Sequence, residues 1–102
     1  MTENKTRTIR RKRNKEDIIL GILDAIDNKN NKIWSIMSNV NLSVLSAKKY
    51  LDYLTEKRMI EEKDGEYILT DRGRRALELL REKEKIEAEL TLLLDKLDNV
   101  LR

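Results

Sequence analysis

The last third of the chain is a single uninterrupted helical pattern, and it limits what the whole chain can fold into. From Thr70 to Leu101 there is no proline, and Gly73 near the start is the only glycine. A helix of about 30 residues is roughly 45 Å long, which is more than a small helical body can cover. The distal half therefore needs a second chain to bury its apolar side chains.

The apolar residues of this segment repeat in heptads. With Ala76 at position a and Leu79 at position d, seven of the eight a and d positions are apolar, and Lys83 is the polar one. Leucines at the e positions widen the stripe. The predicted dimer interface comprises Leu79, Lys83, Ile86, Leu90, Leu93, Leu94, Leu97, Val100 and Leu101.

An antiparallel pairing uses the whole stripe, because a positions then meet d positions of the partner helix. The expected register sets Ala76 opposite Val100 and Lys83 opposite Leu93. A parallel pairing would stack Lys83 on its own copy, which like charges disfavour. The heptads therefore predict an antiparallel homodimer in which Lys83 helps to fix the register.

Three shorter helical patterns precede this segment. Residues 15–27 and 33–40 have apolar residues at helical spacing, and Asn14 is placed to cap the first of these helices. Ser43 is placed to cap a third helix. Its predicted buried residues are Val44, Ala47, Leu51 and Leu54. The second and third helices, joined by a tight turn, form a candidate helix-turn-helix.

A hairpin separates the third helix from the long one. Residues 59–63 and 66–69 flank Asp64-Gly65, a dipeptide typical of tight hairpin turns. The order of elements predicts a mainly α (α+β) winged helix-turn-helix with a two-stranded wing. The expected division is a disordered basic arm at 1–13, a winged helix at 14–71 and a coiled-coil helix at 72–102.

Composition narrows the function further. The 102 residues include no Cys and no His, which excludes Cys/His zinc sites, disulfides and catalysis by a thiol or an imidazole. We expect no metal, no cofactor and no enzymatic activity. No stretch is long and apolar enough to span a bilayer, so we also expect a cytoplasmic, nucleoid-associated protein with no membrane partner.

The charge is divided unevenly along the chain. Residues 1–15 carry seven basic groups and Glu3, a net charge of +6, whereas the remaining residues carry 15 basic and 18 acidic groups, a net charge of −3. Such a cationic arm favours a polyanion as partner. The predicted phosphate-binding residues of the arm are Arg7, Arg10, Arg11, Lys12 and Arg13. An arm of this kind can also lie in a minor groove.

Several motifs resemble those of the small archaeal chromatin-type winged-helix DNA-binding proteins. They are Asn41-Leu42-Ser43, Leu51-x-x-Leu54, Met59-Ile60, the Asp64-Gly65 turn, and Tyr67-Ile68-Leu69-Thr70 with Gly73. The resemblance implies binding of double-stranded DNA through the third helix by a homodimer with an antiparallel coiled coil. Arg58 departs from the glycine often found after that helix, and the basic arm is not a hallmark of the family.

The third helix supplies the remaining DNA-binding candidates. Its expected solvent face carries Ser43, Ser46, Lys49, Tyr50 and Tyr53, with Lys48 at its flank. Because this face offers no Arg, Asn or Gln to read base edges, we expect low sequence specificity. The acids of the hairpin are expected to keep the wing tip from entering a groove deeply.

Arg74 is a further phosphate candidate at the start of the long helix, and Trp34 is interpreted as a packing residue or a dimer contact. Alternative functions remain open: a sequence-specific transcriptional regulator, a protein-interaction module with an incidental arm, and RNA binding through the arm. A solvated tail, a nuclear-type address and adsorption to anionic lipid are further alternatives for the arm.

Overall fold

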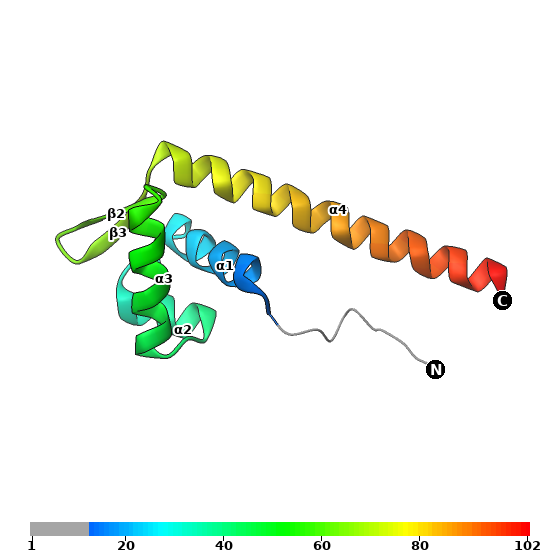
Figure 1. Cartoon of the computed structure of the whole chain (residues 1–102), viewed down its shortest axis with the longest axis horizontal. Helices are drawn as coiled ribbons and strands as arrows, with labels where there is room; N and C mark the ends of the chain where they lie inside the picture. The colour runs from blue at the N-terminus through cyan, green and yellow to red at the C-terminus, as the bar shows by residue number, and fades with distance from the viewer. Residues whose placement is uncertain (1–12) are drawn as a thin grey trace.

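The computed structural model describes residues 13–102 as a winged-helix body from which a long helix projects (Figure 1). Of the predicted arm at residues 1–13, residues 1–12 lie outside the described residues. The elements follow the predicted order. They are α1 (Lys15–Asp27), α2 (Ile33–Val40), α3 (Val44–Glu56), β2 (Ile60–Lys63), β3 (Glu66–Leu69) and α4 (Asp71–Leu101).

Side-chain caps set where the helices begin. The side chain of Asn14 accepts a hydrogen bond from the Asp17 N–H at 2.8 Å, and the Asp17 carboxylate accepts one from the Asn14 N–H at 3.0 Å. Ser43 and Thr70 cap α3 and α4 in the same way, through single bonds from backbone N–H groups. These contacts satisfy N–H groups that a helix leaves unpaired, and they confirm the caps predicted at Asn14 and Ser43.

The wing is a short antiparallel hairpin. Ile60 pairs with Leu69 at its base and Lys63 pairs with Glu66 at its tip. Asp64 and Gly65 both have positive φ angles, of 54° and 80°, as a tight turn of the primed type requires. The two base residues are buried, so they fix the hairpin to the helices.

One hydrophobic core joins all the elements of the body. The fully buried side chains come from α1, α2, α3 and β2 and are Ile22, Leu23, Ile36, Leu51, Leu54 and Ile60. Gly73 and Leu77 of α4 are also buried. The first turns of α4 therefore belong to the winged-helix body, and the remainder of α4 projects from it as a rod. The helix is continuous across the predicted domain boundary at residue 72.

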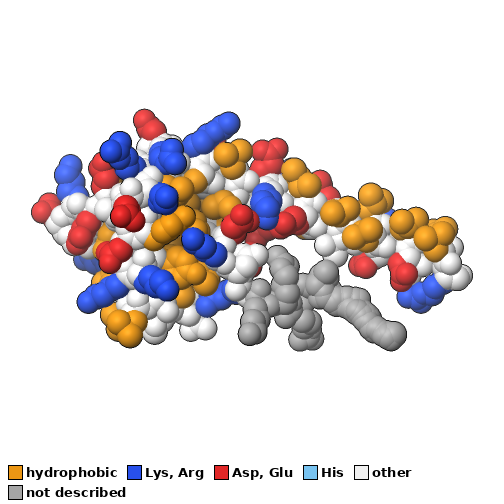
Figure 2. Space-filling model, in the orientation of Figure 1, with side chains coloured by type: hydrophobic (Ala, Val, Ile, Leu, Met, Phe, Trp, Pro, Cys, Tyr) orange, Lys and Arg blue, Asp and Glu red, His pale blue; other side chains and the backbone are white. Residues whose placement is uncertain are grey.

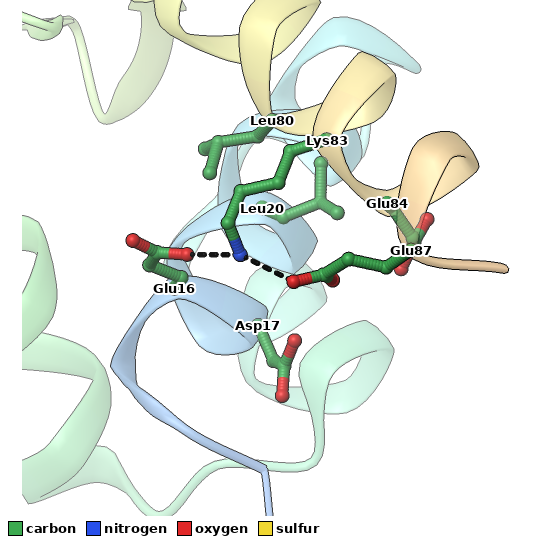
Figure 3. Close-up of a pocket in the computed structure, with 7 residues that line it drawn as sticks. All are labelled: Glu16, Asp17, Leu20, Leu80, Lys83, Glu84 and Glu87. Carbon is green, nitrogen blue, oxygen red and sulfur yellow. Dashed lines mark hydrogen bonds and ion pairs between the residues drawn. The ribbon is translucent and has the colours of Figure 1, made fainter. Parts of the chain in front are cut away.

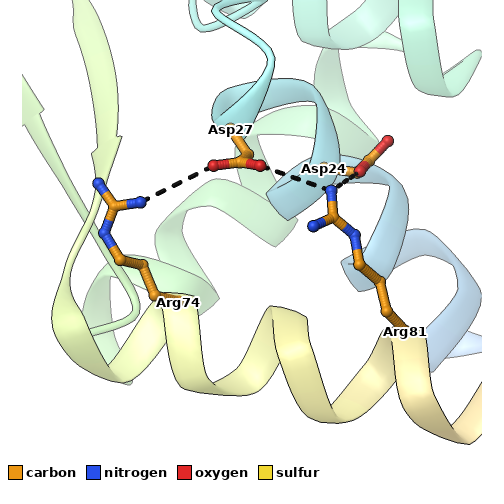
Figure 4. A network of polar contacts seen from close by, with 4 residues as sticks. All are labelled: Asp24, Asp27, Arg74 and Arg81. Atoms are coloured by element: carbon orange, nitrogen blue, oxygen red, sulfur yellow. Dashed lines mark hydrogen bonds and ion pairs between the residues drawn. The ribbon is translucent and has the colours of Figure 1, made fainter.

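Ion pairs connect α4 to α1 along the side of the body (Figure 4). Arg81 contacts Asp24 and lies 3.5 Å from Asp27, and Arg74 lies 3.8 Å from the other oxygen of Asp27. The hydrogen bond that the Arg81 guanidinium donates to Asp24 raises the pKa of Arg81. Because the partners are partly exposed, each pair contributes at most about 1 kcal/mol. Their effect is to orient the rod on the body.

Lys83 takes part in a second contact between these helices (Figure 3). Its ammonium lies 2.9 Å from Glu16 of α1 and 2.8 Å from Glu87 of α4. Hydrogen bonds to Glu87 and Glu16 raise the pKa of Lys83. Lys83, the polar residue of the predicted dimer interface, thus lies between two faces of α4. One face packs on α1, and the other carries the exposed apolar side chains.

Arg58 is a site where one substitution should stabilise the fold. It follows α3 with a φ of 62°, in the left-handed region that favours glycine, while the Met59 N–H bonds to the Leu54 carbonyl at 2.9 Å. Relief of this strain in Arg58→Gly is expected to raise the free energy of unfolding by about 0.5–1 kcal/mol. Urea unfolding at a fixed protein concentration measures the change.

The neighbouring residue gives the matched control for this prediction. Lys57 has an ordinary φ of −80°, so Lys57→Gly gains no relief of strain and only increases the freedom of the unfolded chain. It should lower the stability. An Arg58→Gly protein that also unfolds at lower urea than the wild type would contradict the strain argument.

Candidate nucleic-acid interface

Most of the helix-turn-helix lies in a segment of the chain that has no acidic residue. Between Asp27 and Asp52 lie 24 residues with four lysines and no carboxylate. This segment includes α2, the turn and the first half of α3. The local charge therefore suits a polyanion, although the body as a whole is slightly acidic. The total charge of the body hides this feature, but a plot of charge along the sequence reveals it.

The solvent face of α3 differs from the predicted one. Tyr50 and Tyr53 are partly buried and pack against the core. The outermost ridge instead follows the spacing i, i+4, i+7, i+11, and its members are Leu45, Lys49, Asp52 and Glu56. Val44, expected in the core, is 47% exposed. The prediction that Tyr50 and Tyr53 belong to the open face is wrong, because their large rings cover the edge of the core.

The acids on this ridge divide α3 into two halves. The first half presents Ser43, Lys48 and Lys49, whereas the second presents Asp52 and Glu56 to solvent. A carboxylate close to phosphates is repelled. The half that can approach nucleic acid is therefore the N-terminal one, and Ser46 lies within it, partly buried.

The N-terminal segment joins the body beside the helix-turn-helix. The guanidinium of Arg13 donates to the carbonyl of Val40 and, at 3.3 Å, to that of Asn41. These carbonyls end α2, where a cation is favoured. Two residues on, the ammonium of Lys15 lies 4.2 Å from the ring centre of Tyr53 on α3. The root of the cationic segment is thus fixed against both α2 and α3.

Arg7, Arg10, Arg11 and Lys12, which were predicted to contact DNA, lie outside the described residues. Arg13 is described, and its side chain caps α2. Arg74 remains largely exposed while it pairs with Asp27. Of the predicted set, the fold therefore brings Arg13 next to the turn before α3 and places Arg74 on the α1 side of α4.

The wing presents acids, as its sequence predicted. Glu61, Glu62, Asp64 and Glu66 are all exposed. Between α3 and the wing is a groove lined by Lys48, Asp52, Glu62 and Tyr67, among other residues. Burial, with the charges of Glu62 and Asp52, raises the pKa of Tyr67. This side of α3 is not suited to phosphates.

The far part of α4 exposes apolar side chains along its length (Figure 2). The predicted interface leucines, Ile86 and Val100 are between 50% and 80% exposed in the single chain. Exposed apolar side chains in a row along a helix are typical of an interaction surface. Trp34 is 68% exposed, so its interpretation as a packing residue is wrong within its own chain. Within the part of the chain that the structure describes, no helix is long and apolar enough to cross a membrane.

Comparison with known proteins agrees with this architecture. The family model described as winged helix-turn-helix matches residues 12–88. The uncharacterized protein MJ0290 of Methanocaldococcus jannaschii is 39% identical over 71 residues, which are 70% of this chain and 34% of that protein. The chain thus spans about a third of the length of this relative.

A solved structure supports the same fold. Sso10a-2, a DNA-binding protein from Sulfolobus solfataricus, superposes with a TM-score of 0.74 at 24% identity, covering 88% of this chain and 98% of that one. Both relatives come from archaea, which agrees with the resemblance stated from the sequence. The family model covers most of the chain, and the body has the three helices and the wing of this fold. The chain therefore belongs to the winged helix-turn-helix family.

Proposed function

We propose that the protein binds double-stranded DNA as a homodimer, with low sequence specificity and an architectural role. The observation that carries this proposal is the attachment of the cationic segment to the helix-turn-helix through Arg13 and Lys15. The arm and the acid-free half of α3 then begin from one side of the body. A single duplex bound there meets both.

Dimerisation follows from the exposed stripe of α4. Its nine predicted interface positions lie on the rod, and the apolar ones are exposed in the single chain. A second copy is the favoured occupant, because in an antiparallel pair the heptads place apolar residues opposite each other in every layer except the one where Lys83 meets Leu93. The ion pairs that Arg74 and Arg81 make with α1 do not involve these positions (Figure 4), whereas Lys83, one of the nine, pairs with Glu16 of α1. Two bodies at opposite ends of a rod suit bridging or bending of DNA.

Low specificity follows from the side chains that α3 offers. Its N-terminal half presents hydroxyls and lysines, and it carries none of the Arg, Asn or Gln side chains that make bidentate contacts with bases. Phosphate contacts made by the arm carry no sequence information. The salt dependence of binding should therefore be steep, with a slope of log affinity against log salt of roughly −7 to −12 for the dimer.

Removal of the arm charges tests this function. In one variant the five basic residues of the arm that precede Arg13 are replaced by Gln, which keeps the length and leaves the Arg13 cap intact. The slope should become shallower by about 4 to 9, and affinity at about 100 mM salt should fall by two orders of magnitude or more. A mobility-shift titration on genomic and random duplexes at two salt concentrations measures both quantities. The five residues are Lys5, Arg7, Arg10, Arg11 and Lys12.

The other possible outcomes separate the alternatives. If the wild type does not retard duplex DNA at about 100 mM salt, the proposal fails in favour of a protein-interaction module. Equal or tighter binding of structured RNA would replace DNA as the ligand. A footprint confined to one short operator would favour a sequence-specific regulator.

A further inference from the structure

Leu45 is the most exposed large hydrophobic side chain of the winged-helix body, and it lies at the start of α3. It is 79% exposed, more than Trp34, Val44 or Ile68 in the same body. It lies in the first turn after the Ser43 cap and heads the outer ridge, one turn before Lys49. Most of the apolar surface of this leucine therefore stays in water and is not buried by the residues that the structure describes.

The surroundings of Leu45 favour a nucleic-acid partner over a protein one. Ser43, Ser46, Lys48 and Lys49 surround it on the helix, and the first carboxylate of α3 is Asp52, two turns further on. Hydroxyls and lysines at this spacing suit phosphates at the edges of a groove. An apolar side chain between them would then face the groove floor.

Only one base presents an apolar group in the major groove. Thymine carries a C5-methyl there, and apolar side chains contact it. In helix-turn-helix proteins the N-terminal residues of the recognition helix are the ones that reach base edges. Leu45 has both the chemistry and the location for this contact, whereas Lys49 on the same ridge has the reach for phosphates.

From these observations we infer that Leu45 inserts into the major groove and contacts thymine methyl groups, which gives an otherwise unspecific protein a preference for thymine-containing steps. This inference rests on the proposed DNA binding and adds a residue that determines specificity. The preference is modest, because burial of one methyl group changes the affinity only about fourfold.

Replacement of thymine by uracil tests the inference directly, since it removes the methyl and keeps every hydrogen-bonding group of the base. The wild type should bind a short alternating A·T duplex about fourfold more tightly, for each methyl covered, than the uracil duplex of the same sequence. In Leu45→Ala this ratio should fall to about one. Competition titrations with the two duplexes at one salt concentration give the ratio.

Leu92→Ala is the matched control, because it makes the same change at an exposed leucine of the distal rod. It should keep the wild-type ratio. Equal wild-type binding of the two duplexes would overturn the inference while DNA binding stands, and so would a thymine preference that survives in Leu45→Ala. If neither duplex is bound, the proposed function itself fails.

Discussion

Gly73→Ala is expected to lower the free energy of unfolding by about 3 kcal/mol, a large effect for one methyl group. A Cβ at this position would overlap the Met59 carbonyl oxygen and lie 2.9 Å from its carbonyl carbon. That carbonyl also accepts the Thr70 N–H at 3.0 Å, so it cannot move without a loss at the start of α4. Urea unfolding followed by circular dichroism measures the change.

Gly21→Ala is the control for this prediction, since both glycines lie in helices and gain the same helix propensity. A Cβ at Gly21 would lie 3.2 Å from a Val40 methyl, which can shift slightly. The gain in propensity offsets the tight contact, so its stability should change by no more than about 1 kcal/mol. Similar stabilities for the two variants would contradict the close approach of Met59 to α4.

Leu90→Asp is expected to separate the dimer and to weaken DNA binding about 100-fold at fixed salt, because the two bodies then bind independently. Leu90 is half exposed in the single chain and lies at the centre of the predicted seam, opposite Ile86 of the second copy. A carboxylate there would be buried without a partner. Mobility-shift titrations should also show a salt slope about half that of the wild type.

Leu92→Asp makes the same chemical change two residues away. Leu92 is 58% exposed but falls outside the a, d and e positions of the heptads, so this variant should remain dimeric and bind DNA like the wild type. Wild-type affinity and slope in Leu90→Asp would show that the apolar stripe does not hold two DNA-binding bodies together.

The order and bounds of the elements followed from the sequence because local signals define them. The caps at Asn14, Ser43 and Thr70 accept hydrogen bonds from backbone N–H groups three residues away, and the Asp64-Gly65 turn depends on the φ angles of its own two residues. The effect of these signals therefore does not depend on distant contacts. The contact between Gly73 and Met59 could not be predicted in this way. It joins two elements whose approach is set by packing of the whole body.

The face of α3 was the least predictable part of the candidate site. Tyrosine has a polar hydroxyl and a large apolar ring, and the sequence pattern treated Tyr50 and Tyr53 as solvent residues. In the structure their rings pack against the core, so the exposed ridge of α3 is formed by other residues, among them Leu45, Asp52 and Glu56. A side chain of mixed character can be assigned to a face only when its neighbours are known.

Ion pairs between helices also depend on the tertiary structure. Arg81 was not singled out from the sequence, because its partners Asp24 and Asp27 lie more than 50 residues away. Arg13 was predicted as one of several equivalent arm cations, yet its side chain caps α2. In contrast, the acid-free segment from 28 to 51 is visible in the sequence and needs no structure.

Sedimentation equilibrium of the full chain at micromolar concentration tests the central claim, that the long helix joins two copies into one DNA-binding unit. The account predicts a particle with twice the mass of one chain. It also predicts that two chains together bind duplex DNA as one unit. A particle with the mass of one chain, both free and bound to DNA, would contradict it.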